Sequence, residues 1–394
     1  MKILVLNSGS SSLKCQYFID NKSVASLLIE GIATTKSHTK LEAFNIEKKS
    51  DISVANHHEA LDILFDLFKK YNILVNIKDL GAVGHRVVHG GNTFSKPVRI
   101  DDGVIQSIKS LIPLAPLHNP ANLEGIEILY RQYPELAQVA VFDTAFHQSM
   151  PEYSYLYPLP YTLSQTAHIR RYGFHGSSHH YVAKEAAQLL QQELSTLNLI
   201  TIHLGNGASI TAIKEGQSID TSMGFTPLEG LMMGTRSGDI DPAIIPYLKR
   251  TQDLSVDEID NILNKESGLK GICGSNDMRE VLQGVSDNDP KSKLALDMYV
   301  YRIKKYIGAY TVALGKVDAI VFTAGIGEHA SKVRELVCEG LYESIGLEID
   351  KEKNENAEVE IQSQRSKIKL FIIATDEELE IAMQTQVLIE KVSS

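Results

Sequence analysis

A strand, a tight turn of small polar residues and a second strand occur twice in this chain. Residues 3–6 are apolar, residues 7–12 read NSGSSS, and residues 13–18 are again mostly apolar. Mid-chain, the strand-like residues 199–202 and 210–213 flank the turn sequence HLGNGAS. Each segment predicts two strands joined by a tight turn. Two copies, each opening one half of the chain, indicate a duplicated domain.

Both turns are suited to contact with phosphate. Small residues let the backbone approach a ligand closely, and exposed N–H groups and hydroxyls can surround phosphate oxygens. Either turn alone has an ordinary alternative, a hairpin without a ligand. The two together favour a nucleotide held from both sides by the two halves.

Length and charge set broad limits on the function. A chain of 394 residues is too long for one core, and its net charge of −10 argues against a nucleic-acid binder. The N-terminus lacks the pattern of a signal peptide, and no apolar run is long enough to span a bilayer. The three cysteines show no CxxC spacing and are expected to be free thiols. We therefore expect a cytoplasmic enzyme without nucleic-acid or membrane partners.

Predicted strands and helices alternate along the chain. Strands are expected at residues 80–89, 138–142, 318–323 and 370–374, and helices at 57–71, 105–111, 122–133, 181–193, 257–264, 293–314 and 376–391. Residues 114–120 are expected to form an irregular loop, and 324–328 a glycine-rich turn. This alternation predicts an α/β protein. Prolines after residue 150 place the domains at 1–150 and 151–377, with a last helix, 378–394, packing back on the first domain.

Five segments combine charged residues with turn signals. They span residues 7–14, 84–91, 142–147, 170–179 and 224–242. The fifth is the most specific, because its Gly, Thr, Arg, Ser and Asp residues suit neither a helix nor a strand. An arginine held in such a loop, here Arg236, offers a fixed fork to a phosphate or carboxylate.

At these five segments the chain resembles the acetate kinase family. NSGSSSLK at residues 7–14 and MGTRSGDIDP at residues 233–242 match the family's two signatures, and the resemblance covers nearly the whole chain. It implies two related actin-like (ribonuclease H-like) domains around a nucleotide cleft. It also implies reversible, direct in-line transfer of phosphate from ATP to acetate, giving acetyl phosphate and ADP, with Mg²⁺ or possibly Mn²⁺, in a homodimer.

Arg86 and Arg236 are the candidates for binding the carboxylate and the transferred phosphoryl group, one from each half of the chain. Phosphoryl transfer needs in-line positioning and neutralised oxygens more than covalent chemistry. The alternative for each arginine is a structural ion pair. His175 lies close to two glycines, and the resemblance implies that it stabilises the transition state. A zinc site with His179 is disfavoured, because no HExxH motif or third ligand accompanies the pair.

Asp143 follows a predicted strand. A phosphorylated aspartate is conceivable there, but Ala145 stands where a phosphatase motif has its second Asp. The resemblance instead implies that Asp143 orients an arginine or holds Mg²⁺ through water. Asn7 is a candidate partner for phosphate or Mg²⁺, with a turn-forming role as the alternative.

The last helix begins with an acidic sequence. Thr375 and Glu378 have the spacing of a capping box, which would use Glu378 for the backbone. Glu377 would then project outward. The resemblance places the family's Mg²⁺-associated glutamate here, and Mg²⁺ favours one or two carboxylates plus phosphate oxygens. We therefore expect Glu377, together with Asp143, near the ion.

The resemblance also assigns nucleotide contacts, mostly in the second half. They are Lys14, His203, Leu204, Gly205, Asn206, Gly207, Asp277, Met278, Arg279, Gly325, Ile326, Gly327 and Glu328. His329 stands where the family often has Asn, which affects the expected base and ribose contacts. No Walker A or GxGxxG pattern occurs, which disfavours a P-loop kinase and a Rossmann dehydrogenase.

An apolar pocket for the acyl methyl group is expected from Val88, Leu117, Phe174 and Pro227, which match the family's pocket. A core position is the alternative for each. One methylene in such a pocket changes discrimination by about 1–3 kcal/mol, so acetate, propionate and butyrate all stay open as substrates. A different class, an ATP-driven conformational module like Hsp70 or actin, is the remaining alternative.

Overall fold

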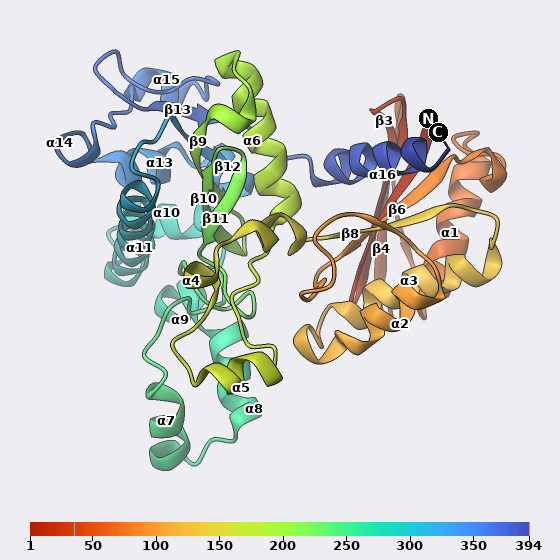
Figure 1. The fold of residues 1–394 in the computed structure, drawn as a ribbon, viewed down its shortest axis with the longest axis horizontal. Helices are drawn as coiled ribbons and strands as arrows, with labels where there is room; N and C mark the ends of the chain where they lie inside the picture. Colours follow the sequence, from red (N-terminus) through yellow and green to blue (C-terminus); the bar gives the residue numbers. More distant parts are fainter. Residues whose placement is uncertain (35, 394) are drawn as a thin grey trace. The chain divides into compact units, whose positions relative to one another are not determined.

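The computed structural model describes residues 1–34 and 36–393 and divides the chain into two compact units (Figure 1). The first unit comprises Met1–Phe146 with Asp376–Ser394, and the second comprises His147–Thr375. Both boundaries fall a few residues before the positions expected from the sequence.

The first unit is built on a single large sheet. Its eight strands lie in the order β5-β4-β3-β2-β1-β6-β8-β7. They are β1 (Lys2–Gly9), β2 (Ser12–Ile19), β3 (Lys22–Glu30), β4 (Ser37–Ala43), β5 (Ile46–Ile52), β6 (Ala82–Val87), β7 (Val98–Arg99) and β8 (Gln138–Phe142). β1 to β5 pair antiparallel, whereas β1, β6 and β8 are parallel to one another.

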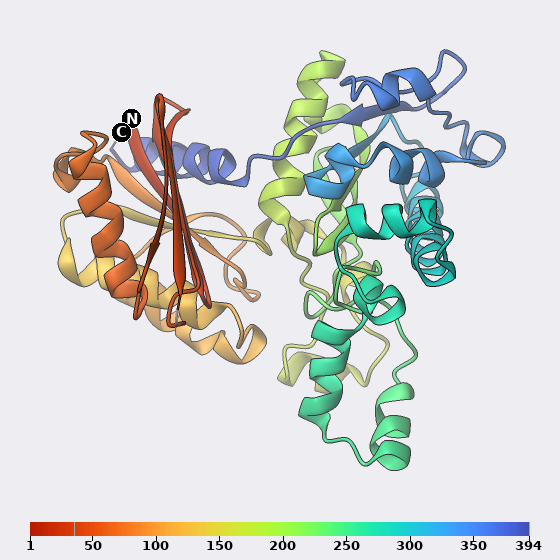
Figure 2. The same ribbon diagram turned by 180° about the vertical axis from the view of Figure 1, so that it is seen from behind.

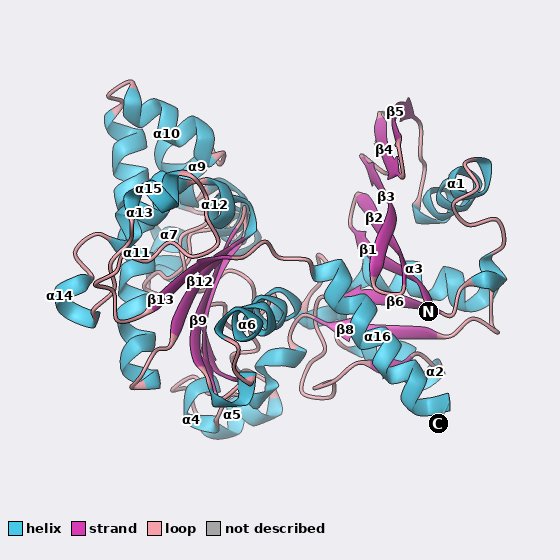
Figure 3. Ribbon diagram, turned by 90° about the horizontal axis from the view of Figure 1, so that it is seen from above, coloured by secondary structure: helices cyan, strands magenta, loops and turns pink. Residues whose placement is uncertain are grey.

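Helices cover both faces of this sheet at β1 and β6. Successive side chains of a strand point to opposite faces. Leu4 and Leu6 join a buried cluster with α1 (His57–Lys70) and α3 (Asn119–Gln132). Ile3 and Val5 pack instead against α16 (Glu377–Ser393), the last helix (Figure 3). The C-terminal helix therefore completes the core of the first unit.

The second unit has a five-stranded sheet in the order β11-β10-β9-β12-β13. The strands are β9 (Asn198–Leu204), β10 (Ala208–Lys214), β11 (Gln217–Thr221), β12 (Ala319–Thr323) and β13 (Lys369–Ile372). Helices α6 (Gly176–Leu190) and α11 (Pro290–Leu314) lie on opposite faces of this sheet (Figures 1 and 3).

The two sheets share one topology. The order β3-β2-β1-β6-β8 in the first unit corresponds to β11-β10-β9-β12-β13 in the second. In each, three antiparallel strands are followed by two strands parallel to the first of them. The two turns that repeat in the sequence, β1–β2 and β9–β10, occupy equivalent places. The α/β class and the duplication predicted from the sequence are confirmed.

The remaining helices surround these sheets (Figure 2). They are η1 (Ile77–Asp79), α2 (Asp102–Ser110), η2 (Ile112–Leu114), η3 (Ala145–Ser149), α4 (Glu152–Tyr155), α5 (Tyr161–Thr166), η4 (Leu194–Thr196), α7 (Ile244–Gln252), α8 (Val256–Asn261), the π-helix η5 (Ile262–Glu266), α9 (Gly268–Cys273), α10 (Met278–Ser286), α12 (Ala324–His329), α13 (Ser331–Cys338), α14 (Tyr342–Ile345) and α15 (Lys351–Glu355).

Several helices begin before the residue expected from the sequence, and one predicted turn is helical; three of these differences lie near predicted site residues. α3 starts at Asn119, inside the expected loop, because Pro120 suits the first turn of a helix. α6 starts at Gly176, five residues before the expected 181. Residues 324–328 belong to helix α12, not to a glycine-rich turn. The latter two corrections place predicted site residues on helix N-termini.

Two expectations from composition are also addressed by the structure. Cys15, Cys273 and Cys338 are free cysteines, as predicted. In the part of the chain that the structure describes, none of the helices combines the length and apolar character needed to cross a membrane.

Candidate active site

The first unit collects predicted site residues at the carboxyl ends of its parallel strands. Leu6 of β1 pairs with His85 of β6, and Val87 of β6 pairs with Phe142 of β8. Asn7, Arg86 and Asp143 therefore come to the same edge of the sheet. In open α/β sheets this is the edge where ligands usually bind.

Arg86 and Asp143 form a two-point ion pair. Arg86 Nε lies 3.0 Å from Asp143 Oδ1, and Nη2 lies 2.7 Å from Oδ2. Burial opposes the charge of Arg86, but Asp143 and Glu377 outweigh it and raise the pKa of the guanidinium. This geometry agrees with an orienting role for Asp143. The ion-pair alternative for Arg86 is thus present, but it also fixes the direction of the guanidinium.

The predicted capping box at α16 is wrong. The Leu379 N–H donates to Asp376 Oδ1 at 2.8 Å, so Asp376 caps the helix. Thr375 donates its hydroxyl to Ser178 Oγ at 2.8 Å instead. Glu378 pairs with Lys14 Nζ at 2.7 Å and not with the backbone. An Asp one residue later has the same capping ability as the predicted Thr, and tertiary contacts engage the other two side chains.

Glu377 lies where a cation is favoured. Its Oε2 is 3.9 Å from Arg86 Nε, and its side chain is only 18% exposed. Burial raises the pKa of this carboxyl, and the charges of Asp143 and Glu378 raise it further, against Arg86 and Lys14. Three carboxylates thus face two cations, an imbalance that Mg²⁺ would correct.

The donor set fits Mg²⁺ of the kind bound with phosphate. Among residues 1–34 and 36–393, no group of three or more His, Cys, Asp or Glu side chains could hold a metal by itself. Mg²⁺ usually takes one or two carboxylates and completes its shell with water and phosphate oxygens. Glu377 supplies one such carboxylate. Asn7 is half-buried on β1 and pairs in register with Lys14 of β2. Lys14 in turn forms an ion pair with Glu378, the residue next to Glu377.

In the second unit, the turn after β9 brings two predicted catalytic residues together. A Cβ atom added at Gly207 would lie 3.3 Å from Arg236 Nη1 and 3.6 Å from His175 Nε2. The absence of a side chain at Gly207 therefore leaves room beside both the guanidinium of Arg236 and the imidazole of His175. Residues 175 and 236 come from the fourth and fifth segments of the sequence, and the turn from the repeat.

Arg236 differs from Arg86 in its electrostatics. Its Nη1 donates to the Pro227 carbonyl at 3.3 Å and contacts Met233 Sδ at 3.8 Å. Across the described residues it forms no ion pair with a carboxylate. Burial lowers the pKa of its guanidinium. A partly buried cation without a carboxylate partner favours an anionic ligand.

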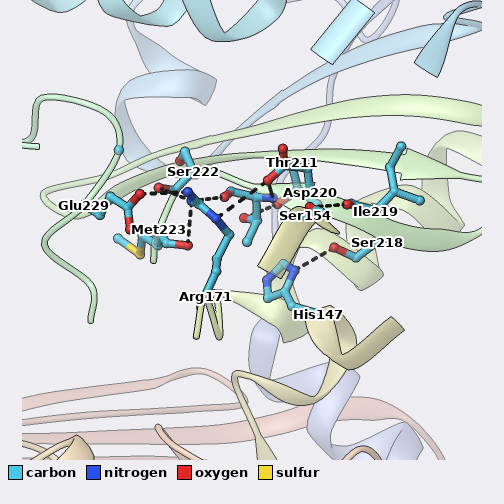
Figure 4. Close-up of polar contacts among 12 residues, drawn as sticks. His147, Ser154, Arg171, Thr211, Ser218, Ile219, Asp220, Ser222, Met223 and Glu229 are labelled. Atoms are coloured by element: carbon cyan, nitrogen blue, oxygen red, sulfur yellow. Dashed lines mark hydrogen bonds and ion pairs between the residues drawn. The ribbon is translucent and has the colours of Figure 1, made fainter. Parts of the chain in front are cut away.

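The loop that carries Arg236 is anchored at two points. Figure 4 shows the Arg171 guanidinium between Glu229 and Ser222; its Nη2 lies 2.7 Å from Glu229 Oε1. Asp239, at the other end of the loop, accepts from the Gly230 N–H and from the Tyr306 hydroxyl, both at 2.8 Å. Arg171 lies in the fourth segment of the sequence and Asp239 in the fifth, but neither anchoring role was predicted.

His175 is held in an unusual backbone conformation. It caps α6 with a left-handed φ of 56°, and its ring stacks on His203 with centroids 4.1 Å apart. His203 Nδ1 lies 2.8 Å from Ser178 Oγ. His203, predicted as a nucleotide contact, therefore supports His175. Leu204 is fully buried, so only its backbone is available to a ligand.

The other predicted nucleotide residues form two groups in the second unit. Asn276, which the sequence analysis did not name, donates to Asn206 Oδ1 at 3.1 Å and links the turn to Asp277. Asp277 caps α10 and pairs with the exposed Arg279, while Met278 is buried.

The second group lies on α12, which packs against β9 and contains Gly325, Ile326, Gly327 and Glu328. Glu328 Oε1 accepts from the backbone N–H groups of Ala324 at 2.8 Å and Thr375 at 3.2 Å. Its side chain therefore secures the backbone at the start of this helix.

The four predicted pocket residues divide between the units. Val88 and Phe174 are buried, Pro227 is half-buried, and Leu117 is 56% exposed. Val88 lies just beyond the end of β6, whereas the sequence predicted a strand as far as residue 89. Its backbone N–H donates to Asn122 Oδ1 at 3.0 Å.

Comparison with known proteins identifies the family. Residues 2–383 match the model of the acetokinase family. The chain belongs to the acetokinase family. An acetate kinase of Sulfurovum sp. (strain NBC37-1) is 63% identical over the full length of both chains. An acetate kinase of Campylobacter jejuni subsp. jejuni (strain 81-176) is 50% identical over 99% of this chain and 100% of its own.

Solved structures of acetokinases have the same fold. A propionate kinase from Francisella tularensis is 46% identical and gives a TM-score of 0.93, covering 98% of this chain and 99% of its own. The acetate kinase of Porphyromonas gingivalis is 42% identical, with the same TM-score and coverage. The resemblance seen in the sequence and the expected fold of two actin-like domains are thereby confirmed.

Proposed function

We propose that this acetokinase transfers the γ-phosphoryl group of ATP to acetate, reversibly, giving acetyl phosphate and ADP. The observation that carries the proposal is the convergence of Arg236 and His175 on the side-chain-free position Gly207. Two potential hydrogen-bond donors close to one point, in a turn suited to phosphate, can stabilise charge on a transferring phosphoryl group.

The proposed roles follow from the charges of the two units. Arg236, partly buried and without a carboxylate partner among the described residues, neutralises phosphoryl oxygens, and His175 donates a hydrogen bond to them. Arg86, whose direction Asp143 fixes, binds the acetate carboxylate and the incoming phosphoryl group. An acetate oxygen attacks the γ-phosphorus as the bond to the ADP oxygen breaks. No residue of the chain is phosphorylated in this direct transfer.

Glu377 is the proposed metal ligand, with Asn7 nearby. When bound, Mg²⁺ neutralises charge on the phosphate oxygens. Mn²⁺ accepts the same carboxylate and amide donors. Lys14 adds positive charge at the end of β2, where its pair with Glu378 orients it. ATP contacts are proposed at the turn 205–207, at residues 277–279 and at the start of α12.

Acetate is the proposed substrate and propionate the alternative. The relatives from Sulfurovum and Campylobacter are named acetate kinases, whereas a comparably similar structure is named a propionate kinase. Val88, Leu117, Phe174 and Pro227 are proposed to contact the acyl group. Their size decides how many carbons it can have.

A hydroxylamine trap tests the proposal. Purified protein, ATP and Mg²⁺ are incubated with acetate, propionate or butyrate, and the acyl hydroxamate is measured. We expect hydroxamate from acetate at the highest catalytic efficiency. ATP hydrolysis that does not respond to any carboxylate would instead support a conformational module. A higher efficiency with propionate would correct the substrate but keep the chemistry.

A homodimer working in the cytoplasm is also proposed. Large apolar side chains are exposed on the second unit at Ile244, Tyr247, Tyr301 and Val312. Ile244 and Tyr301 line one cavity of about 740 Å³ between α11 and the loop before α7. Exposed apolar side chains that lie together, as Ile244 and Tyr301 do around this cavity, often mark protein interfaces. Sedimentation equilibrium should give twice the mass of 43.6 kDa, and a monomer would contradict the proposal.

A further inference from the structure

The hydroxyl of Ser209 lies between two histidine rings. Ser209 Oγ is 2.9 Å from His175 Nδ1 and 2.7 Å from His179 Nε2. The other nitrogen of His179, Nδ1, lies 2.7 Å from Thr201 Oγ1. Ser209, His179 and Thr201 are all fully buried. A continuous chain of hydrogen bonds therefore runs from the interior of the second unit to the ring of His175.

Proton counting limits this chain to two arrangements. A hydroxyl carries one proton and two lone pairs, so Ser209 donates to at most one histidine. Accepting from both rings would leave its buried proton without an acceptor among the described residues, because the two histidines are the partners of its Oγ, so Ser209 donates to one histidine and accepts from the other. Burial, with His147 and His203 nearby, lowers the pKa of His179 well below its usual value, so its ring is neutral and carries one N–H. Every bond in the chain must therefore point the same way, either toward His175 or away from it.

Thr201 distinguishes the two directions. If the bonds point toward His175, Thr201 donates its proton to His179 Nδ1. If they point away, Thr201 accepts from His179, and its own proton needs another acceptor. Among the described residues, His179 is the one hydrogen-bond partner of the Thr201 hydroxyl. A buried hydroxyl proton without an acceptor is costly, so the direction toward His175 is favoured.

The favoured direction sets the chemistry of His175. Ser209 then donates to His175 Nδ1, which leaves the proton of the neutral ring on Nε2. His175 Nε2 is the atom beside Gly207 and Arg236. In this tautomer it presents a donor to an anion, whereas the opposite tautomer would present a lone pair. A donor fixed before the reaction requires no reorganisation when charge develops.

We propose that Thr201, His179 and Ser209 are positioning residues that hold His175 in the Nε2–H tautomer. The inference rests on the proposed function for the role of His175, but its structural part does not. The sequence alone gave no signal for these hydrogen bonds. Thr201, Ser209 and His179 lie on β9, β10 and α6, respectively, and meet only in the folded unit.

The tautomer is measured directly in the ligand-free protein. The full chain is labelled with ¹⁵N-histidine, and two-bond ¹⁵N–¹H correlation spectra report which ring nitrogen carries the proton. His175→Gln assigns the His175 signals. We expect His175 as the Nε2–H tautomer in the parent. A parent protein with His175 mainly protonated on Nδ1 alone would overturn the proposal.

Two variants interrupt the chain of hydrogen bonds without making a side chain larger. Thr201→Val removes the terminal donor, and Ser209→Ala removes the link. Each should give a mixture of His175 tautomers and lower kcat by about tenfold or more, while KM for ATP changes less than about threefold. Thr211→Val is the matched control, because Thr211 pairs in register with Thr201 across β10 and β9 but bonds to Thr221.

The control should keep both the Nε2–H tautomer and kcat. If Thr201→Val and Ser209→Ala also keep both, or if Thr211→Val lowers kcat as they do, the proposal is wrong. The two proposals fail separately. If the protein made no acyl hydroxamate, the proposed function would be contradicted. The spectra of the parent and the variants would still test the tautomer of His175.

Discussion

Asp143 binds Arg86 through both carboxylate oxygens, with Nη2 to Oδ2 at 2.7 Å and Nε to Oδ1 at 3.0 Å. Asp143 is 1% exposed, so this pair is almost removed from water. Hydrogen bonds from the guanidinium to both oxygens stabilise the carboxylate and make it a weaker nucleophile. The finding favours an aspartate that orients Arg86.

The first prediction concerns this pair. Asp143→Asn keeps the shape of the side chain but can accept at only one oxygen, so Arg86 loses its fixed direction. We expect kcat to fall by about 100-fold, the scale of a misplaced catalytic group. Steady-state kinetics measure the loss. Labelling with [γ-³²P]ATP should leave no phosphate on the parent protein; a labelled Asp143 would contradict direct transfer.

The second prediction concerns Arg236. Arg236→Ala should lower kcat by about 100-fold or more with the fold intact, because the lost interaction is stronger in the transition state than in the ground state. Circular dichroism checks the fold. Arg131→Ala is the control, since Arg131 is 73% exposed and pairs with Glu127 on its own helix. If the two variants had the same kcat, Arg236 would not be a catalytic residue.

The third prediction separates the adjacent glutamates of α16. Glu377→Gln should abolish Mg²⁺-dependent activity and weaken Mg²⁺ binding. Glu378→Gln should retain Mg²⁺ binding and alter the affinity for ATP, because it releases Lys14. Isothermal titration with Mg²⁺ and with nucleotide distinguishes the two effects. If Glu378→Gln lost Mg²⁺ binding and Glu377→Gln kept it, Glu378 and not Glu377 would be the metal ligand.

The helix cap provides the matching stability test. Asp376→Ala removes the acceptor for the Leu379 N–H and should lower the free energy of unfolding by about 0.5–2 kcal/mol. Thr375→Val should not remove a cap from α16, because Thr375 bonds to Ser178 instead. Urea unfolding of both variants measures the difference. A larger loss of helix stability in Thr375→Val would restore the capping box predicted from the sequence.

The fourth prediction concerns substrate size. If Val88 contacts the acyl group, Val88→Ala makes room for longer carboxylates, and the ratio of kcat/KM for propionate and acetate should rise about tenfold. Val87→Ala is the neighbouring control, because Val87 lies in the core with Phe94 and Phe142. The control should lose about 1–3 kcal/mol of stability and keep the ratio. An unchanged ratio in Val88→Ala would place Val88 in the core.

The fifth prediction concerns acid stability. Burial lowers the pKa of His85 to about 4, against about 6.5 in an unfolded chain. Between these values the unfolded state binds more protons, so stability must fall as the pH falls. From about pH 7.5 to about pH 5.5, His85 alone should cost about 1 kcal/mol. Urea unfolding should show a smaller pH dependence in His85→Gln, and an equal dependence would contradict the buried neutral ring.

Local signals in the sequence predicted much of the fold. The short apolar run after a predicted helix located β8 at residues 138–142, as the structure has it. The repeated turns predicted the duplicated topology, and the same turn supplied Gly207. A predicted strand end marked Asp143 as a candidate site residue, and the charged, glycine-containing segment 84–91 marked Arg86. These features depend on residues close together in the chain, so the sequence itself records them.

Only the tertiary structure decided which side chains meet. Asp376 rather than Thr375 caps α16, because Ser178, distant in sequence, binds the Thr375 hydroxyl. Ser209 links two histidines because β10 lies beside β9 beneath α6. The sequence by itself determined the elements and most of the candidate site residues. The partners of those residues depend on contacts between distant segments, which local propensity and spacing do not encode.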